Sequence, residues 1–142
     1  MGFRNGALLT LAAALLSTAP ASGQDVPLAR DTQLLVGQWR GDVVENYHGE
    51  VSRYRMFVSI DADRNGRPIA SVSYNLECRG VWINGELRGR IWHFEETITA
   101  GRDNCAWQDE VELTREADGL HVRLWPVGVP EQLAQSVLRR SE

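Results

Sequence analysis

The feature that most constrains this chain is a series of short segments in which apolar and polar residues alternate. In residues 52–61, for example, Met56, Val58 and Ile60 share one side. A period of two is typical of a β-strand with one buried face. For the last segment, near the C-terminus, a helical turn beginning near Pro130 is the alternative to a strand. Read in this way, the sequence predicts eight strands, near residues 36–46, 52–61, 69–78, 79–87, 90–99, 107–116, 120–126 and 134–140.

The connections between these segments are short and carry turn signals. Asn65-Gly66 is typical of a tight hairpin, because both residues tolerate positive φ. No long amphipathic helix interrupts the strands, which favours an all-β fold over alternating α/β units. We therefore expect an eight-stranded antiparallel up-and-down barrel, since closure removes exposed strand edges. A two-sheet sandwich is the alternative.

The N-terminus is typical of an export signal. Arg4 is followed by an apolar run over residues 7–16 and by small residues suited to cleavage after Ala21 or Gly23. The run is about half of the roughly 20 residues needed to cross a bilayer, and no cysteine near the cleavage site could carry a lipid anchor. We expect a signal peptide over 1–23, a flexible lead over 24–35 and one domain over 36–142, in the periplasm or secreted.

The charge balance excludes some function classes. The chain has 15 arginines, no lysine and 19 acidic residues, for a net charge of −4. A mildly acidic chain is not typical of a nucleic-acid partner. Without lysine there is no Schiff-base chemistry and no phosphate loop that depends on a lysine.

Cys78 and Cys105 are the two cysteines of the chain. An even pair in an exported protein predicts a disulfide. This bond would tie the end of the third strand to the loop before the sixth.

Metal and catalytic motifs are incomplete. Asp61, Asp63, Asn65 and Gly66 match the first half of a calcium loop, but Val72 stands where the bidentate acid is needed. The three histidines lie in separate segments, and there is no G-x-S-x-G nucleophile motif. We expect no metal, no cofactor and no enzymatic activity.

Glu96 is the unusual residue. Strand alternation places it on the same face as Phe94 and Ile98, where an ionised carboxylate needs a partner. We predict Arg140 as that partner, because closing the barrel brings the last strand beside the first, near Trp39. The alternative is that Glu96 is a ligand-binding acid in an open cavity.

The five tryptophans are the other candidates for binding. Alternation predicts that Trp39 and Trp92 are buried, and that Trp82 and Trp125 lie on the surface. The candidate binding residues are therefore Glu96, Arg140, Trp39, Trp82 and Trp125.

Several short motifs carry a resemblance: Gly37-x-Trp39-x-Gly41, Tyr74-x-Leu76-x-Cys78-x-Gly80, Phe94-x-Glu96-x-Ile98 with Gly101 and Cys105, and Leu138-x-Arg140. In these the chain resembles a small bacterial β domain, found alone as an exported protein or appended to serine/threonine kinases and caspase-like proteases. The resemblance implies no established activity. The Gly-x-Trp start with a late arginine is also similar to lipocalin and avidin-like barrels and to periplasmic metalloprotease inhibitors.

Two functions follow from these features. The first is a non-catalytic binding or interaction module for a small molecule, glycan or protein, because a stapled barrel is a rigid scaffold for recognition. The second is a periplasmic inhibitor of a secreted hydrolase, with the lead or a loop as the inserted segment.

Overall fold

The computed structural model describes residues 25–142, which form one helix and eight strands. The elements are α1 Asp25–Gln33, β1 Gly37–Tyr47, β2 Glu50–Ala62, β3 Pro68–Tyr74, β4 Cys78–Arg88, β5 Ile91–Ala100, β6 Gln108–Glu116, β7 Gly119–Pro126 and β8 Leu133–Arg140. The eight predicted strands are confirmed, each with similar bounds. The predicted signal peptide over 1–23 lies outside the described residues.

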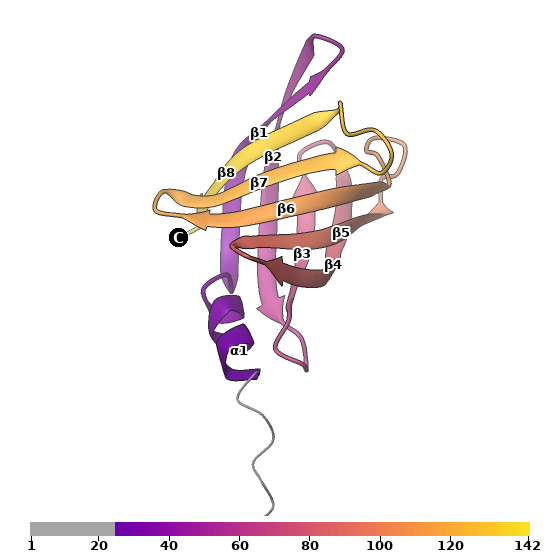
Figure 1. Cartoon of the computed structure of the whole chain (residues 1–142). Coiled ribbons are helices and arrows are strands. Elements are labelled where there is room, and N and C mark those ends of the chain that lie inside the picture. Colours follow the sequence, from indigo (N-terminus) through magenta and orange to yellow (C-terminus); the bar gives the residue numbers. More distant parts are fainter. Residues whose placement is uncertain (1–24) are drawn as a thin grey trace, which may run out of the picture.

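The strands form a closed antiparallel barrel in which each pairs with its neighbours in sequence and β8 returns to β1 (Figure 1). This confirms the up-and-down barrel and excludes the sandwich. Inward-facing residues of every strand form the core, and Val43, Met56, Ile98 and Leu113 are each fully buried. Apolar residues at every second position therefore make the core.

One end of the barrel is covered by α1 and the residues that follow it (Figure 1). Thr32 and Leu35 are buried, and the Thr32 hydroxyl donates to the carbonyl of Gly66 at 2.6 Å. The indole of Trp39 donates to the carbonyl of Leu35 at 2.8 Å. The expectation of a flexible lead over 24–35 is therefore wrong, because a helix and buried anchors occupy most of it. This helix is too short to span a membrane, and the described residues contain no other helix.

The prediction that Trp82 lies on the surface is also wrong. Trp82 is 0 % exposed, whereas Ile83 is 38 % exposed on the outside of the barrel. The register of β4 shifts between Ile83 and Glu86, where Asn84 has a φ of 57°. The resulting bulge changes which positions face inward, so no single alternation describes the strand.

The predicted disulfide between Cys78 and Cys105 is confirmed. It ties the start of β4 to the loop between β5 and β6, at the end of the barrel opposite α1. Gly101 in this loop has a φ of 75°, and a Cβ there would overlap the Glu77 carbonyl. Glycine is therefore needed where the loop passes the Cys78–Cys105 disulfide.

The predicted hairpin between β2 and β3 is also confirmed. The Asp63 carboxylate accepts from the backbone amides of Asn65 and Arg67, at 2.8 and 3.0 Å. Gly66 has a φ of 76°. The aspartate therefore supports the turn through its side chain.

A candidate ligand pocket at the open end of the barrel

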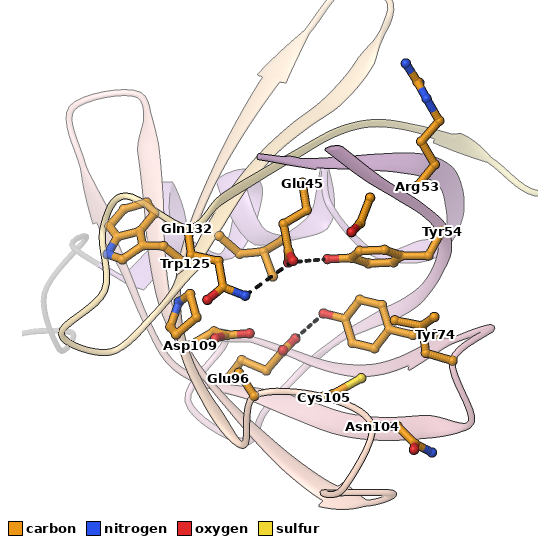
Figure 2. A pocket seen from close by; sticks show the side chains of 15 residues that line it. Glu45, Arg53, Tyr54, Tyr74, Glu96, Asn104, Cys105, Asp109, Trp125 and Gln132 are labelled. Atoms are coloured by element: carbon orange, nitrogen blue, oxygen red, sulfur yellow. Dashed lines mark hydrogen bonds between the residues drawn. The ribbon is translucent and has the colours of Figure 1, made fainter. Parts of the chain in front are cut away.

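A pocket of about 510 Å³ opens at the end of the barrel opposite α1 (Figure 2). Its lining comes from the ends of the strands at that mouth and from the loop that carries Cys105. The lining residues are Glu45, Ser52, Arg53, Tyr54, Tyr74, Leu76, Glu96, Asn104, Cys105, Ala106, Asp109, Leu124, Trp125, Pro126 and Gln132. The interior of the barrel therefore opens to solvent at this mouth, whereas α1 covers the other end.

Glu96 lies at the base of the pocket and is 1 % exposed. Its Oε2 accepts hydrogen bonds from the Tyr74 hydroxyl and the Trp82 indole, both at 2.6 Å. Burial raises the pKa of Glu96, while these bonds and contact with Asp109 oppose the shift. The prediction that Glu96 is buried among apolar residues is confirmed, but its two donors are neutral.

Asp109 pairs directly across from Glu96 in the β5–β6 ladder and is 7 % exposed. The two carboxyl groups lie within hydrogen-bonding reach of each other. Burial, the charge of Glu96 and this contact raise the pKa of Asp109 from 3.8 to about 8. Two adjacent carboxylates away from water cannot both ionise readily, so the pair shares a proton at neutral pH.

Glu45 is a third carboxylate on the opposite wall (Figure 2). It accepts from the Tyr54 hydroxyl at 3.2 Å and from the side-chain amide of Gln132 at 3.3 Å. Burial and the charge of Glu45 raise the pKa of Tyr54 well above its usual range. Tyr54 is therefore a neutral donor that holds Glu45 in place.

The predicted pairing of Arg140 with Glu96 is wrong. Arg140 does lie opposite Trp39 in the β1–β8 ladder, with its guanidinium 4.3 Å from the centre of the indole ring. It donates to the carbonyls of Val36 and Leu34 at 3.0 and 3.4 Å. Because β8 ends beside α1, Arg140 and Trp39 belong to the covered end of the barrel. Neither of them lines the pocket.

Of the two tryptophans predicted to lie on the surface, Trp125 lines the pocket. It is half-buried at the mouth, and its indole donates to Glu110 at 2.8 Å. Trp107, to which the sequence assigned no location, is 56 % exposed, with the Arg102 guanidinium 5.5 Å from its ring centre. Trp92 is buried, as predicted.

Asp109 is the site residue that sequence reasoning missed. It has the same strand phase as Val111 and Leu113, which alternation along residues 107–116 would place on an apolar face. Pairing the fifth and sixth predicted strands would also have placed it opposite Glu96. The pair forms between two strands, so alternation within either strand alone does not show it.

Comparison with known proteins gives little further information. No family model and no curated protein matches the chain. A structural comparison finds the crystal structure of Rv2717c from M. tuberculosis, with a TM-score of 0.45 and 13 % sequence identity, covering 82 % of this chain and 98 % of that one. A similarity this distant indicates nothing about the function of this chain.

Proposed function

We propose that this chain is an exported, non-catalytic binding domain whose barrel mouth holds a small molecule. The observation that supports the proposal is the pocket of about 510 Å³, open at one end and based on the buried pair of Glu96 and Asp109. Sites for small ligands are concave, mostly apolar and carry a few fixed polar groups. Leu76, Leu124 and Pro126 supply apolar wall here, and the carboxyl pair supplies the polar base.

The site favours binding over catalysis. A general acid or base must reach a proton of the substrate. Glu96 is 1 % exposed and its Oε2 is held by Tyr74 and Trp82, so this oxygen is unavailable to a substrate. Hydrogen bonds that fix a buried side chain suit a preformed binding surface.

The alternative function is inhibition of a secreted hydrolase, for which the lead or a loop would be the inserted segment. Of these two candidates, the lead has become the weaker. The lead is anchored at the covered end through Thr32 and Leu35. A loop at the mouth is left as the candidate, and the β1–β2 hairpin reaches furthest there, because β2 pairs with β3 only from Met56 onward (Figure 1). Association with a hydrolase is therefore one outcome of the test below.

Export is part of the same proposal. The disulfide is compatible with an oxidising compartment outside the cytoplasm. The resemblance to exported bacterial β domains agrees with this location. Cell fractionation of the tagged full chain measures it directly, and a reduced protein in the cytoplasm would contradict it.

The decisive experiment is to purify the protein from cells that export it and to record native and denaturing mass spectra. We expect a bound small molecule that is released on denaturation, and a higher Tm when it is added back. Trp125→Ala should weaken rebinding, whereas Phe57→Ala, on the outer face of β2, should not. A co-purifying hydrolase that loses activity, or the absence of any ligand from both the purified protein and a screen of host extract, would contradict the proposal.

A further inference from the structure

The free polar atoms at the base of the pocket are acceptors. Glu96 Oε1 and Asp109 Oδ1 are buried, and no other residue of the described part of the chain donates to either of them, so only the proton that the pair shares can lie between them. The nearby donors, Tyr74 and Trp82, already bind Glu96 Oε2. A ligand that satisfies this base must therefore bring donors of its own.

The charge of the pocket is also one-sided. Glu45, Glu96 and Asp109 line it, and the one lining cation, Arg53, has an exposed side chain at the rim. A concave site lined by one sign of charge concentrates the field and attracts ligands of the opposite sign. The group that can replace the shared proton of the carboxyl pair is therefore a positive charge.

The three carboxylates do not make a metal site. No group of three or more histidine, cysteine or carboxylate side chains within residues 25–142 is arranged to hold a metal ion. Apolar side chains at the mouth, including Leu76, Leu124 and Pro126, instead provide a surface for hydrocarbon. An organic cation with an apolar body fits both parts of the pocket.

We propose that the pocket selects an organic cation, whose ammonium, amidinium or guanidinium head binds at the carboxyl pair of Glu96 and Asp109 in place of its shared proton, while its apolar body lies along the wall near Trp125. This inference rests on the proposed binding function and names its ligand class. Charge-assisted bonds from such a head would satisfy Glu96 Oε1 and Asp109 Oδ1 at once when the shared proton leaves. A carboxylate or phosphate ligand would meet repulsion from the base.

Binding of the cation should also displace the shared proton. The pKa of Asp109 is raised to about 8, so the pair retains a proton at pH 7 that a bound cation replaces. The charged and titratable groups that face the pair are Glu45 of β1, Tyr54 and the rim residue Arg53 of β2, and Tyr74 of β3. The uncharged neighbours are Trp82 of β4, Leu124, Trp125 and Pro126 of β7, and Gln132 of the loop between β7 and β8. The tyrosines stay neutral, because burial raises the pKa of each. Affinity should therefore rise with pH toward 8, by up to about tenfold per pH unit for one displaced proton.

The test uses probes that share a carbon skeleton and differ in the head group. They are 2-phenylethylamine, 2-phenylethanol and phenylacetate, and hexylamine, hexanol and hexanoate, with Mg²⁺ and Ca²⁺ as separate probes. Calorimetric titration of the full exported protein should show each amine binding at least about tenfold more tightly than its alcohol. Titration in two buffers of different ionisation enthalpy should show up to one proton released per amine at pH 7.

Asp109→Asn should abolish proton release and weaken amine binding by about tenfold or more, while leaving the alcohols unchanged. Asp61→Asn, exposed near the covered end, is the matched control. If Asp109→Asn does not fold, Glu45→Gln lowers the negative charge of the pocket from the opposite wall and should also weaken amine binding. Alcohols or carboxylates that bind as tightly as the amines, or metal ions that bind in their place, overturn the cation proposal but leave a binding pocket. Failure of every probe at millimolar concentration overturns the cation proposal, and the purification experiment separately decides the binding function.

Discussion

At the residue scale, the carboxyl pair links stability to pH. The folded state keeps a proton on Asp109 up to about pH 8, whereas the unfolded chain releases it near pH 4. The folded state therefore binds more protons across this window, and stability must fall as pH rises through it. We expect the free energy of unfolding to fall by at least about 1 kcal/mol between pH 5 and 8, since one pKa unit corresponds to about 1.4 kcal/mol.

This prediction is checked by urea denaturation at several pH values. Asp109→Asn should flatten this pH dependence. Its free energy of unfolding, compared with that of the parent protein, should therefore be more favourable at pH 8 than at pH 5. Asp61→Asn should behave like the parent protein. A parent whose stability rises steadily from pH 5 to 8 would show that the pair is ionised in the folded state.

The two donors to Glu96 give a second prediction at the same scale. Glu96→Leu would leave the Tyr74 hydroxyl and the Trp82 indole buried without an acceptor, which should cost about 2–6 kcal/mol at about 1–3 kcal/mol for each group. Glu96→Gln keeps an acceptor oxygen and should cost less than half as much. Denaturant midpoints compare the variants, and equal losses in the two would contradict the donor arrangement.

At the element scale, sequence periodicity predicted the strands well and the phase of β4 poorly. In β2 and β5 the inward positions alternate without interruption, so Met56 and Glu96 were placed on the correct face. In β4 the apolar residues Val81 and Ile83 suggested an inward face, but they share the phase of the exposed Arg79. The local pattern was ambiguous because even-numbered positions such as Trp82 face inward before the bulge, whereas odd-numbered positions such as Leu87 face inward after it.

The long-range partners were less predictable still. Alternation shows which face a side chain occupies, but not its height along the barrel. Arg140 was therefore placed correctly beside Trp39 and wrongly beside Glu96, which lies toward the other end. The anchoring of α1 by Thr32 also depends on a hairpin distant in sequence.

The helix and its connection to β1 supply the element-scale prediction. Leu35 is 1 % exposed and its neighbour Leu34 is 46 % exposed, which makes them matched probes of the covered end. Leu35→Ala should destabilise by about 2–5 kcal/mol, because it leaves a cavity in the core. Leu34→Ala should cost less than about 1 kcal/mol. Thermal melts of both variants test this, and equal effects would show that the segment is not docked.

At the scale of the whole molecule, the barrel has one end covered by α1 and one end open, and the disulfide belongs to the open end. Cys78 joins the start of β4 to Cys105 in a loop that lines the pocket. The disulfide therefore restrains the open mouth of the barrel and makes no contact at the end covered by α1. Loss of the bond should affect the stability of the whole chain and the shape of the pocket together.

Replacing both cysteines by alanine should destabilise the protein by about 3 kcal/mol, because a bridge across 27 positions restricts the unfolded chain. For a domain of this size, the Tm should fall by roughly 10 °C. Far-ultraviolet circular dichroism should stay that of a β protein, since the core strands keep their partners. Reduction of the parent protein should lower its Tm by a similar amount and leave the double variant unchanged. A parent protein insensitive to reductant, with two thiols that label when it is unfolded without reductant, would contradict the bond itself.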